Sequence, residues 1–199
     1  MRLEYQRGAL ERGDLDPDPI RQLSLWLDQA VAAHEVEPTA MCLATEMQGR
    51  PSARMVLMRG IGPEGLVFYT NEKSRKGREL LANSQVAACF WWSQLERQVR
   101  VEGAVKRLSA EQSDQYFASS PRDSQISAIV SPQSQVIPSR EVLESAAQAV
   151  QETNRPAHWG GFVLQPDQFE FWQGREARLH DRFRYQLRDG KWVIERLAP

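Results

Sequence analysis

Hydrophobic positions recur along the chain with two different periods, which separates an N-terminal helix from a long series of strands. Apolar residues follow one another at helical spacing from Ile20 to Val31, after an N-cap residue and a proline in Asp18-Pro19. This pattern predicts an amphipathic helix over residues 19–34. From residue 39 onward, short β-rich segments are separated by Gly or Pro. They predict strands at 40–45, 52–58, 66–70, 85–92 and 98–108.

Helical signals interrupt the strand series in three places. Ser109 and Gln112 form a capping box, the clearest of these signals. The three helices are predicted over 74–82, 109–119 and 139–153. The chain then returns to strands at 161–165, 168–173, 183–187 and 192–196. Asp189-Gly190 predicts a tight hairpin between the last two of them.

Consecutive strands with short turns favour an antiparallel sheet that closes on itself, because a doubly wound sheet would need strands and helices in strict alternation. The expected fold class is therefore mainly β with flanking helices (α+β). The chain has 199 residues, of which 41% are hydrophobic, and this is enough for one domain with a real core. Residues 1–18 are polar and irregular, so we expect an N-terminal arm before a single domain of residues 19–199.

Composition excludes several classes of protein. No apolar run approaches the roughly 18 residues of a membrane-spanning helix, and the N-terminus lacks a secretory signal, so we expect a cytoplasmic protein that does not bind membranes. Cys42 and Cys89 are far apart in the sequence and the three histidines are dispersed, so neither a disulfide framework nor a metal site is expected. The formal net charge of -1 argues against a nucleic-acid partner.

Arginine dominates the basic residues, since only four of the 25 are lysines, at positions 73, 76, 106 and 191. Codon bias is one explanation. The other is that arginine supplies a planar, bidentate fork for phosphate or carboxylate. Only the placement of individual arginines decides between them.

The segment Gly60–Gly65 matches the glycine pattern of a dinucleotide-binding loop. In that fold the last glycine opens a helix, whereas here a strand-like run, Leu66–Thr70, follows, and Pro63 lies inside the loop. We therefore interpret the segment as a hairpin loop. A Gly-x-Ser-x-Gly nucleophile motif is absent, so covalent hydrolytic catalysis has no support.

Two stretches in the first half are unusually polar for strands and strand ends. Arg54 and Arg59 flank an apolar strand, either as an anion site or as ordinary solvated strand ends. Ser74-Arg75-Lys76 follows Phe68–Asn71 and opens a helix, where free N–H groups, a hydroxyl and two cations suit a phosphate. A plain N-cap with solvated charges is the alternative.

Two further stretches carry the same kind of signal. Gln98 at a strand entrance can hydrogen-bond the edge of a ligand ring or be an ordinary surface residue. Near the C-terminus, Arg178, His180 and Arg182 lie at period two, so on a strand they share one face. Two arginines and an imidazole on one face repel one another unless an anion compensates their charge. Their grouping therefore predicts an anionic ligand.

Together these stretches resemble the pyridoxamine 5′-phosphate oxidase family of flavoenzymes. The resemblance runs from the Leu3-Glu4-Tyr5 arm to Glu195–Pro199. Its motifs are Phe68–Asn71, Ser74-Arg75-Lys76, Leu95–Val99, Ser119–Ile126, Gln133-Ser134, Trp159–Phe162 and Arg178–Phe183.

The resemblance implies an antiparallel split β-barrel that binds FMN at the interface of a homodimer. Cofactor-binding residues would be Arg54, Met55, Val56, Leu57, Met58, Arg59, Tyr69, Thr70, Ser74, Arg75, Lys76, Gln98, Gln133, Ser134, Trp172 and Arg182. Substrate-binding residues would be Arg2, Tyr5, Arg59, Tyr116, Ser120, Ser124, Arg178 and His180. Of these, Arg178 and His180 would be catalytic, positioned at the substrate ring.

The chemistry implied by the resemblance is oxidation of pyridoxamine or pyridoxine 5′-phosphate to pyridoxal 5′-phosphate. A hydride passes to FMN, the imine formed from the amine is hydrolysed, and O2 reoxidises the flavin to give H2O2. Such a cofactor accounts for the absence of a nucleophile or metal motif. Two alternatives remain: a related flavin oxidase acting on another ring compound, such as those of phenazine biosynthesis, and a non-catalytic protein that binds FMN or pyridoxal phosphate.

Two positions depart from the family pattern. The family usually has lysine at position 59 and arginine at position 120, where this chain has Arg59 and Ser120. Ser120 removes a cation from the expected site of the substrate phosphate. Our hypothesis is that Arg122 or the larger Arg59 partly compensates.

Overall fold

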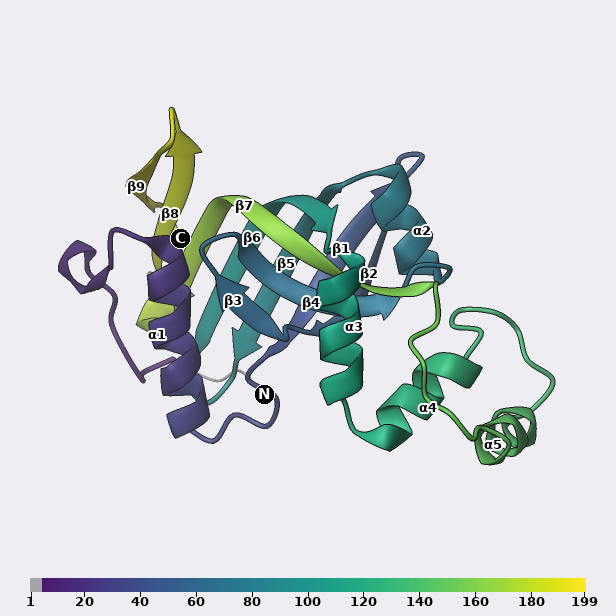
Figure 1. Ribbon diagram of the computed structural model, residues 1–199. Helices are drawn as coiled ribbons and strands as arrows, with labels where there is room; N and C mark the ends of the chain where they lie inside the picture. The colour runs from purple at the N-terminus through teal and green to yellow at the C-terminus, as the bar shows by residue number, and fades with distance from the viewer. Residues whose placement is uncertain (1–4) are drawn as a thin grey trace.

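The computed structural model describes residues 5–199 and has a single nine-stranded antiparallel sheet at its centre (Figure 1). The strands are β1 (Ala40–Met47), β2 (Arg50–Leu57), β3 (Gly60–Gly62), β4 (Gly65–Asn71), β5 (Gln85–Trp92), β6 (Arg97–Arg107), β7 (Trp159–Gln173), β8 (Asp181–Arg188) and β9 (Lys191–Leu197). The helices are α1 (Pro19–Ala32), α2 (Arg75–Ala82), α3 (Ala110–Ser119), α4 (Arg122–Val130) and α5 (Arg140–Gln148). Two short 3-10 turns, η1 (Arg12–Asp14) and η2 (Glu176–Arg178), complete the list.

Strand β7 is the branch point that splits the barrel. It pairs with β6 along its length, while its first half pairs with β4 and its second half with β8. The path through the sheet is β2-β1-β5-β6-β7-β4-β3, so β2 is an edge strand. The 161–165 and 168–173 strands of the sequence analysis are therefore one continuous strand. Gly103 marks the bulge opposite its middle, because a Cβ there would lie 2.1 Å from the Gln165 carbonyl oxygen.

Aromatic side chains fill the barrel, and α1 covers it through Leu23, Trp26 and Ala30. Trp26 packs edge-on against Phe171 at a centroid distance of 5.1 Å. Figure 1 shows α1 on the left of the barrel, α3 near the middle of the view, and α4 and α5 at the lower right. None of the described helices is long and apolar enough to cross a membrane.

The predicted antiparallel barrel and most of its elements are confirmed. Asp18 caps α1 by accepting a hydrogen bond from the Ile20 amide at 2.9 Å, and the Ser109–Gln112 capping box opens α3. The segment Gly60–Gly65 is a hairpin, since β3 pairs with β4 and no helix follows. Cys42 and Cys89, distant in the sequence, are direct cross-strand partners with free thiols.

Two helices differ from the expectations, and the described part of the arm packs against the domain. Helix α4 lacks a clear apolar stripe and was not predicted, and α5 ends at Gln148 instead of residue 153. The described part of the arm is not separate from the domain, because Leu10 and Leu15 are buried in the core. The Leu10 amide donates to the Asp181 carboxylate at 3.1 Å, which ties the arm to β8.

Candidate functional site

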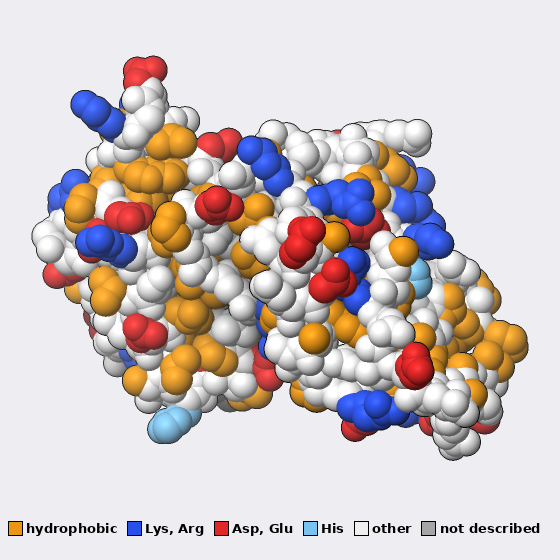
Figure 2. Space-filling view, in the orientation of Figure 1, with side chains coloured by type: hydrophobic (Ala, Val, Ile, Leu, Met, Phe, Trp, Pro, Cys, Tyr) orange, Lys and Arg blue, Asp and Glu red, His pale blue; other side chains and the backbone are white. Residues whose placement is uncertain are grey.

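A cavity of about 640 Å³ opens between the edge strand β2, strand β4 and helices α2, α3 and α4. The sequence-predicted residues that line it are Met55, Val56, Leu57, Arg59, Tyr69, Thr70, Lys76, Tyr116, Ser120, Ser124 and Gln133. Basic side chains gather around the position of α2 on the face shown in Figure 2. The cavity therefore combines an apolar wall with a cationic end.

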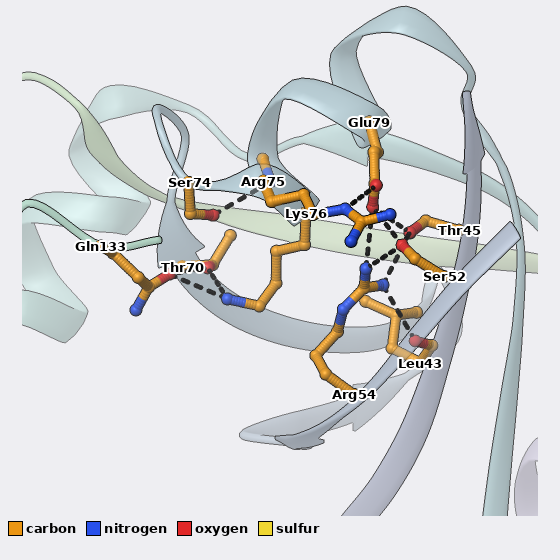
Figure 3. Close-up of polar contacts among 11 residues, drawn as sticks. Leu43, Thr45, Ser52, Arg54, Thr70, Ser74, Arg75, Lys76, Glu79 and Gln133 are labelled. Atoms are coloured by element: carbon orange, nitrogen blue, oxygen red, sulfur yellow. Dashed lines mark hydrogen bonds and ion pairs between the residues drawn. The ribbon is translucent and has the colours of Figure 1, made fainter. Parts of the chain in front are cut away.

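Lys76 supplies the cation at this end of the cavity. Its Nζ atom donates to Thr70 Oγ1 at 3.0 Å and to Gln133 Oε1 at 2.8 Å, which joins α2, β4 and the loop after α4 (Figure 3). Burial, and then the nearby Arg54 guanidinium, lower the pKa of Lys76. Its positive charge is therefore incompletely compensated by the protein, and an anion placed here would stabilise it.

Glu79 lies behind Lys76, 2% exposed, and binds two arginines at once (Figure 3). Its Oε1 accepts from Arg75 Nε at 2.8 Å, and its Oε2 accepts from Arg54 Nη2 at 2.8 Å. The hydroxyls of Thr45 and Ser52 also donate to Oε2, at 2.6 and 2.7 Å. Burial alone would raise the pKa of Glu79, but these hydrogen bonds outweigh it and lower the pKa to about 2.

Ser74 is the N-cap of α2, because its buried Oγ accepts from the Gly77 amide at 3.1 Å. Its hydroxyl is committed to the helix, so a contact with a cofactor stays a prediction. Ser134 is exposed, has a backbone φ of 70° and is not among the cavity residues. Its contact with the cofactor therefore also stays a prediction.

Strand β2 presents a free backbone edge to the cavity. Among the strands of residues 5–199 it pairs only with β1, so the N–H and C=O groups on its other edge have no partner strand there. Met55, Val56 and Leu57 line the cavity, whereas the Met58 side chain is buried in the core. A planar ring with polar edge atoms would find both an apolar surface and hydrogen-bonding groups at this strand.

Three aromatic rings stack on the opposite wall. Tyr69 and Tyr116 are nearly parallel with centroids 3.8 Å apart, and Trp159 lies 5.2 Å from Tyr69. Arg59 and Ser124 are exposed beside them. Within residues 5–199, Arg59 forms no ion pair, so its charge is available to a ligand.

The substituted position, Ser120, ends α3 at the cavity wall. Its Oγ donates to the Tyr116 carbonyl at 3.0 Å. Arg122 does not fill the missing cation's place, because its guanidinium donates to the Gln151 carbonyl and does not line the cavity. Of the two compensating residues in our hypothesis, the structure favours Arg59.

A second group of the predicted residues lies on the outer face of the sheet. Gln98, Trp172 and Arg182 are direct register partners across β6, β7 and β8. Trp172 packs against His180 with centroids 4.6 Å apart, and Tyr5 of the arm lies edge-on to both rings. Arg182 forms a bidentate ion pair with Glu170 at 2.9 and 3.1 Å. Arg2 lies outside the described residues.

His180 is held in one orientation by the backbone. Its Nδ1 accepts from the Arg175 amide at 3.1 Å, so in the neutral ring the proton resides on Nε2. Burial, followed by the charges of Arg178 and Arg182, lowers its pKa. The ring is therefore a neutral Nε2–H donor at physiological pH.

The expected period-two face of Arg178, His180 and Arg182 is wrong. Strand β8 begins only at Asp181, and Arg178 lies in the η2 turn with a φ of 63°. Ala177 and Arg178 both adopt left-handed backbone, which turns the Arg178 side chain away from a strand geometry. Arg178 is exposed, and Glu170 is the anion that compensates Arg182.

Two positioning residues were missed by the sequence analysis. The i,i+4 spacing of Arg75 and Glu79 was a usable signal, but no local pattern connects Glu79 to Arg54. Gln125 of α4 donates to the carbonyls of Phe117 and Ser120 at 2.8 and 3.0 Å. It thereby fixes α4 under the end of α3, where Ser120 and Ser124 meet.

Comparison with known proteins decides the family. The family model described as pyridoxamine 5′-phosphate oxidase matches residues 27–154, and that of the pyridoxine 5′-phosphate oxidase C-terminal dimerisation region matches residues 159–199. The chain belongs to the pyridoxine/pyridoxamine 5′-phosphate oxidase family. The curated protein of that name from Acidovorax sp. (strain JS42) is 51% identical, over 100% of this chain and 94% of the relative. The one from Gloeothece citriformis is 49% identical, over 100% and 97%.

Solved structures agree with the fold. PhzG from Burkholderia lata 383, in complex with tetrahydrophenazine-1-carboxylic acid, has a TM-score of 0.90 at 30% identity, covering 96% of this chain and 98% of that one. An FMN-binding protein related to pyridoxamine 5′-phosphate oxidase from Nostoc punctiforme has a TM-score of 0.79 at 18% identity, covering 93% and 100%, and shows the split-barrel fold alone.

Family membership makes the chain an oxidoreductase with FMN as its cofactor. The residues fit this group. The free edge of β2 and its apolar side chains suit the flavin ring. Lys76, which lines the cavity, and the adjacent Arg75, whose side chain is 60% exposed, suit the phosphate. Among residues 5–199, no group of three or more His, Cys, Asp or Glu could hold a metal ion.

Proposed function

We propose that the protein oxidises pyridoxamine 5′-phosphate, and pyridoxine 5′-phosphate, to pyridoxal 5′-phosphate. O2 is the electron acceptor and H2O2 the second product. With the amine as substrate, water hydrolyses the imine that is formed, supplies the aldehyde oxygen and releases ammonia. Bound FMN supplies the chemistry, accepting a hydride from the carbon that becomes the aldehyde and passing two electrons to O2. The protein's own residues bind the cofactor and the substrate, orient the substrate and hold protons.

The single observation that carries this proposal is the presence of two separate anion-binding groups in one cavity. Lys76, which lines the cavity, forms the first together with the neighbouring Arg75 at the start of α2, whose side chain is 60% exposed beside the cavity residues. Arg59, Tyr116 and Ser124 form the second, on the opposite wall. One group suits the phosphate of FMN and the other that of a phosphorylated substrate, which fixes the substrate ring against the flavin.

His180 and Arg178 orient the substrate ring in this proposal. The neutral Nε2–H of His180 donates a hydrogen bond to the ring hydroxyl, since Nδ1 is occupied by the Arg175 amide. The exposed Arg178 guanidinium favours the deprotonated amine by its positive charge. Neither residue attacks the substrate.

A homodimer completes the site. The cavity residues and the Trp172–His180 group lie at opposite ends of β7, and its 15 residues span roughly 45 Å if fully extended. The match of residues 159–199 to a dimerisation region supports an assembly in which the C-terminal group of one subunit faces the cavity of the other. FMN would then lie at the interface and contact both subunits.

Aerobic turnover tests the function. Purified protein with FMN is mixed with pyridoxamine 5′-phosphate, and pyridoxal 5′-phosphate and H2O2 are followed together. Equal amounts of the two products are expected. A yellow, FMN-loaded protein that forms no aldehyde would contradict the proposal and favour the non-catalytic binding protein.

A related oxidase of another ring compound is the second candidate, favoured by two observations. Ser120 removes a cation from the substrate end of the cavity, and the PhzG structure, 30% identical, was solved with a phenazine acid that carries a carboxylate. Turnover of unphosphorylated pyridoxamine at the same rate as its phosphate would favour this candidate. Strong preference for the phosphate would exclude it.

A further inference from the structure

A carboxylate next to a phosphate-binding site needs an explanation. Glu79 is almost fully buried and stays ionised, yet its charge repels any phosphate held by Arg75 and Lys76. Considered by its charge alone, an acid at this position would weaken phosphate binding. The hydrogen bonds of Glu79 show what it contributes instead.

Each carboxylate oxygen of Glu79 accepts a hydrogen bond from a different arginine. Oε2 accepts from Arg54, whose two terminal nitrogens also donate to the Leu43 carbonyl at 3.0 Å, to Thr45 Oγ1 at 2.6 Å and to Ser52. The four N–H groups on the two terminal nitrogens of Arg54 are therefore all used inside the protein. Among residues 5–199 only its Nε–H forms no hydrogen bond, so Arg54 cannot present its terminal fork to a ligand.

Arg75 differs from Arg54 in what it leaves free. Only its Nε donates to Glu79, and its terminal nitrogens form no hydrogen bond with residues 5–199. Its side chain is 60% exposed, against 20% for Arg54. Held through Nε, the planar guanidinium presents two parallel N–H groups, the geometry that binds a phosphate in a bidentate way.

We infer that Glu79 is a positioning residue for the FMN phosphate: it fixes Arg75 through Nε so that the terminal nitrogens bind the phosphate, while Arg54 anchors Glu79 from behind. This inference rests on the proposal that the FMN phosphate lies at Arg75 and Lys76. It gives the two arginines different roles. Arg75 presents both terminal nitrogens to the phosphate, while those of Arg54 hold Glu79 in place.

Glu79→Gln tests the inference because an amide cannot replace both oxygens. The amide oxygen can keep the three donors at the Oε2 position, so the NH2 group then faces the Arg75 Nε–H and releases that guanidinium. Apoprotein is titrated with FMN and with riboflavin, which lacks the phosphate, and flavin fluorescence gives both Kd values. Glu64→Gln, at an exposed hairpin turn, is the control with the same change of charge.

Positioning predicts that Glu79→Gln weakens FMN binding about tenfold, as expected for a lost charge-assisted hydrogen bond, and leaves the riboflavin Kd unchanged. In an Arg75→Ala background the same substitution should have no further effect on FMN. Simple charge repulsion predicts the opposite, tighter FMN binding, and that result would overturn the inference. Equal weakening of FMN and riboflavin, the signature of a purely structural role, would overturn it as well.

Glu79→Asp keeps the test informative if the glutamine variant does not fold. Aspartate keeps the negative charge, but its side chain is one methylene shorter and no longer reaches Arg75 in the same way. If Glu79 positions Arg75, FMN affinity should fall while riboflavin affinity stays unchanged. An unchanged FMN Kd would contradict it. A wrong placement of the FMN phosphate looks different, because Arg75→Ala would then leave the FMN Kd unchanged. Failure of the proposed reaction is distinct again: the Kd values would be as predicted, while FMN-loaded wild-type protein would form no pyridoxal 5′-phosphate.

Discussion

Trp159 and Trp172 stand at the two ends of the same strand, β7. Trp159 lines the cavity and lies 5.2 Å from Tyr69, while Trp172 packs against His180 at 4.6 Å. A continuous strand keeps the two ends apart, so one chain does not bring both groups to one ligand. This separation is the physical reason for expecting a site made by two subunits.

Mixing two inactive variants tests that arrangement. Lys76→Ala damages the cavity group and Arg178→Ala the C-terminal group. In a mixed dimer one site carries both defects and the other carries neither, so random exchange of subunits should restore about a quarter of wild-type activity. Co-refolding followed by a turnover assay measures it. Recovery no greater than the sum of the two parents would mean that each site is built within one chain.

Arg178→Ala should separate substrate orientation from cofactor binding. Arg178 is exposed in the η2 turn and makes no ion pair within residues 5–199. We expect the Kd for FMN to stay within about twofold and kcat/KM to fall roughly a hundredfold, since misorientation of a bound substrate has effects of this size. Arg188→Ala, at the exposed end of β8, is the matched control. Turnover within about twofold of wild type would show that Arg178 does not face the substrate ring.

The ionisation of His180 gives a separate test of where Arg178 lies. Because burial, Arg178 and Arg182 lower its pKa, the imidazole should titrate below the ordinary value of about 6.5. Removing the charge in Arg178→Ala should move the titration midpoint toward higher pH. NMR of the imidazole carbon-bound protons measures both midpoints, with His34 as an internal reference outside the cluster. A midpoint that is the same in the two proteins would contradict the placement of Arg178 near His180.

Local sequence signals predicted much of the fold because they act over a few residues. The Asp18 cap, the Ser109 capping box and the alternation of β5 depend on short-range chemistry. Helix α4 escaped because it is held by Gln125 bonding to α3 carbonyls, a tertiary contact without an apolar stripe. Likewise, β7 was divided in two because a polar segment at its bulge resembled a turn.

The site was predicted less fully for a related reason. Residue types and order indicated the cations, but whether an arginine is free or engaged depends on partners from other strands. Arg54 is engaged by Glu79 and Arg182 by Glu170, and neither pair is local in sequence. The period-two argument failed at Arg178 because two left-handed residues end the alternation there.

Ser120→Arg tests the meaning of the altered phosphate site. Ser120 lies at the cavity wall at the end of α3, so a longer side chain there can reach the space beside Arg59. We expect the KM for pyridoxamine 5′-phosphate to fall about tenfold, the effect of one charge-assisted hydrogen bond, with the FMN Kd unchanged. Arg122→Ala should leave KM unaltered, because Arg122 is engaged with Gln151. An unchanged or higher KM in Ser120→Arg would show that Arg59 already satisfies the phosphate.

Glu79 should also govern acid stability. Its pKa is about 2 in the folded protein against an ordinary value of 4.5, so the folded state binds its proton less readily. A depressed pKa contributes stability above pH 4.5 that is lost as pH falls toward 2, and the difference amounts to about 3 kcal/mol. The gap in free energy of unfolding between wild type and Glu79→Gln should therefore be largest at pH 7 and shrink by pH 3.

Urea unfolding of the apoprotein at fixed concentration measures this gap, since dimer formation would otherwise shift the midpoints. Glu144→Gln is the matched control, because Glu144 is an exposed acid that pairs with Arg140 on α5. Exposed pairs contribute little, so this control should differ from wild type by less than about 1 kcal/mol at every pH. A wild-type to Glu79→Gln gap that is the same at pH 7 and pH 3 would mean that the carboxylate is not held ionised by Arg54, Arg75 and the two hydroxyls.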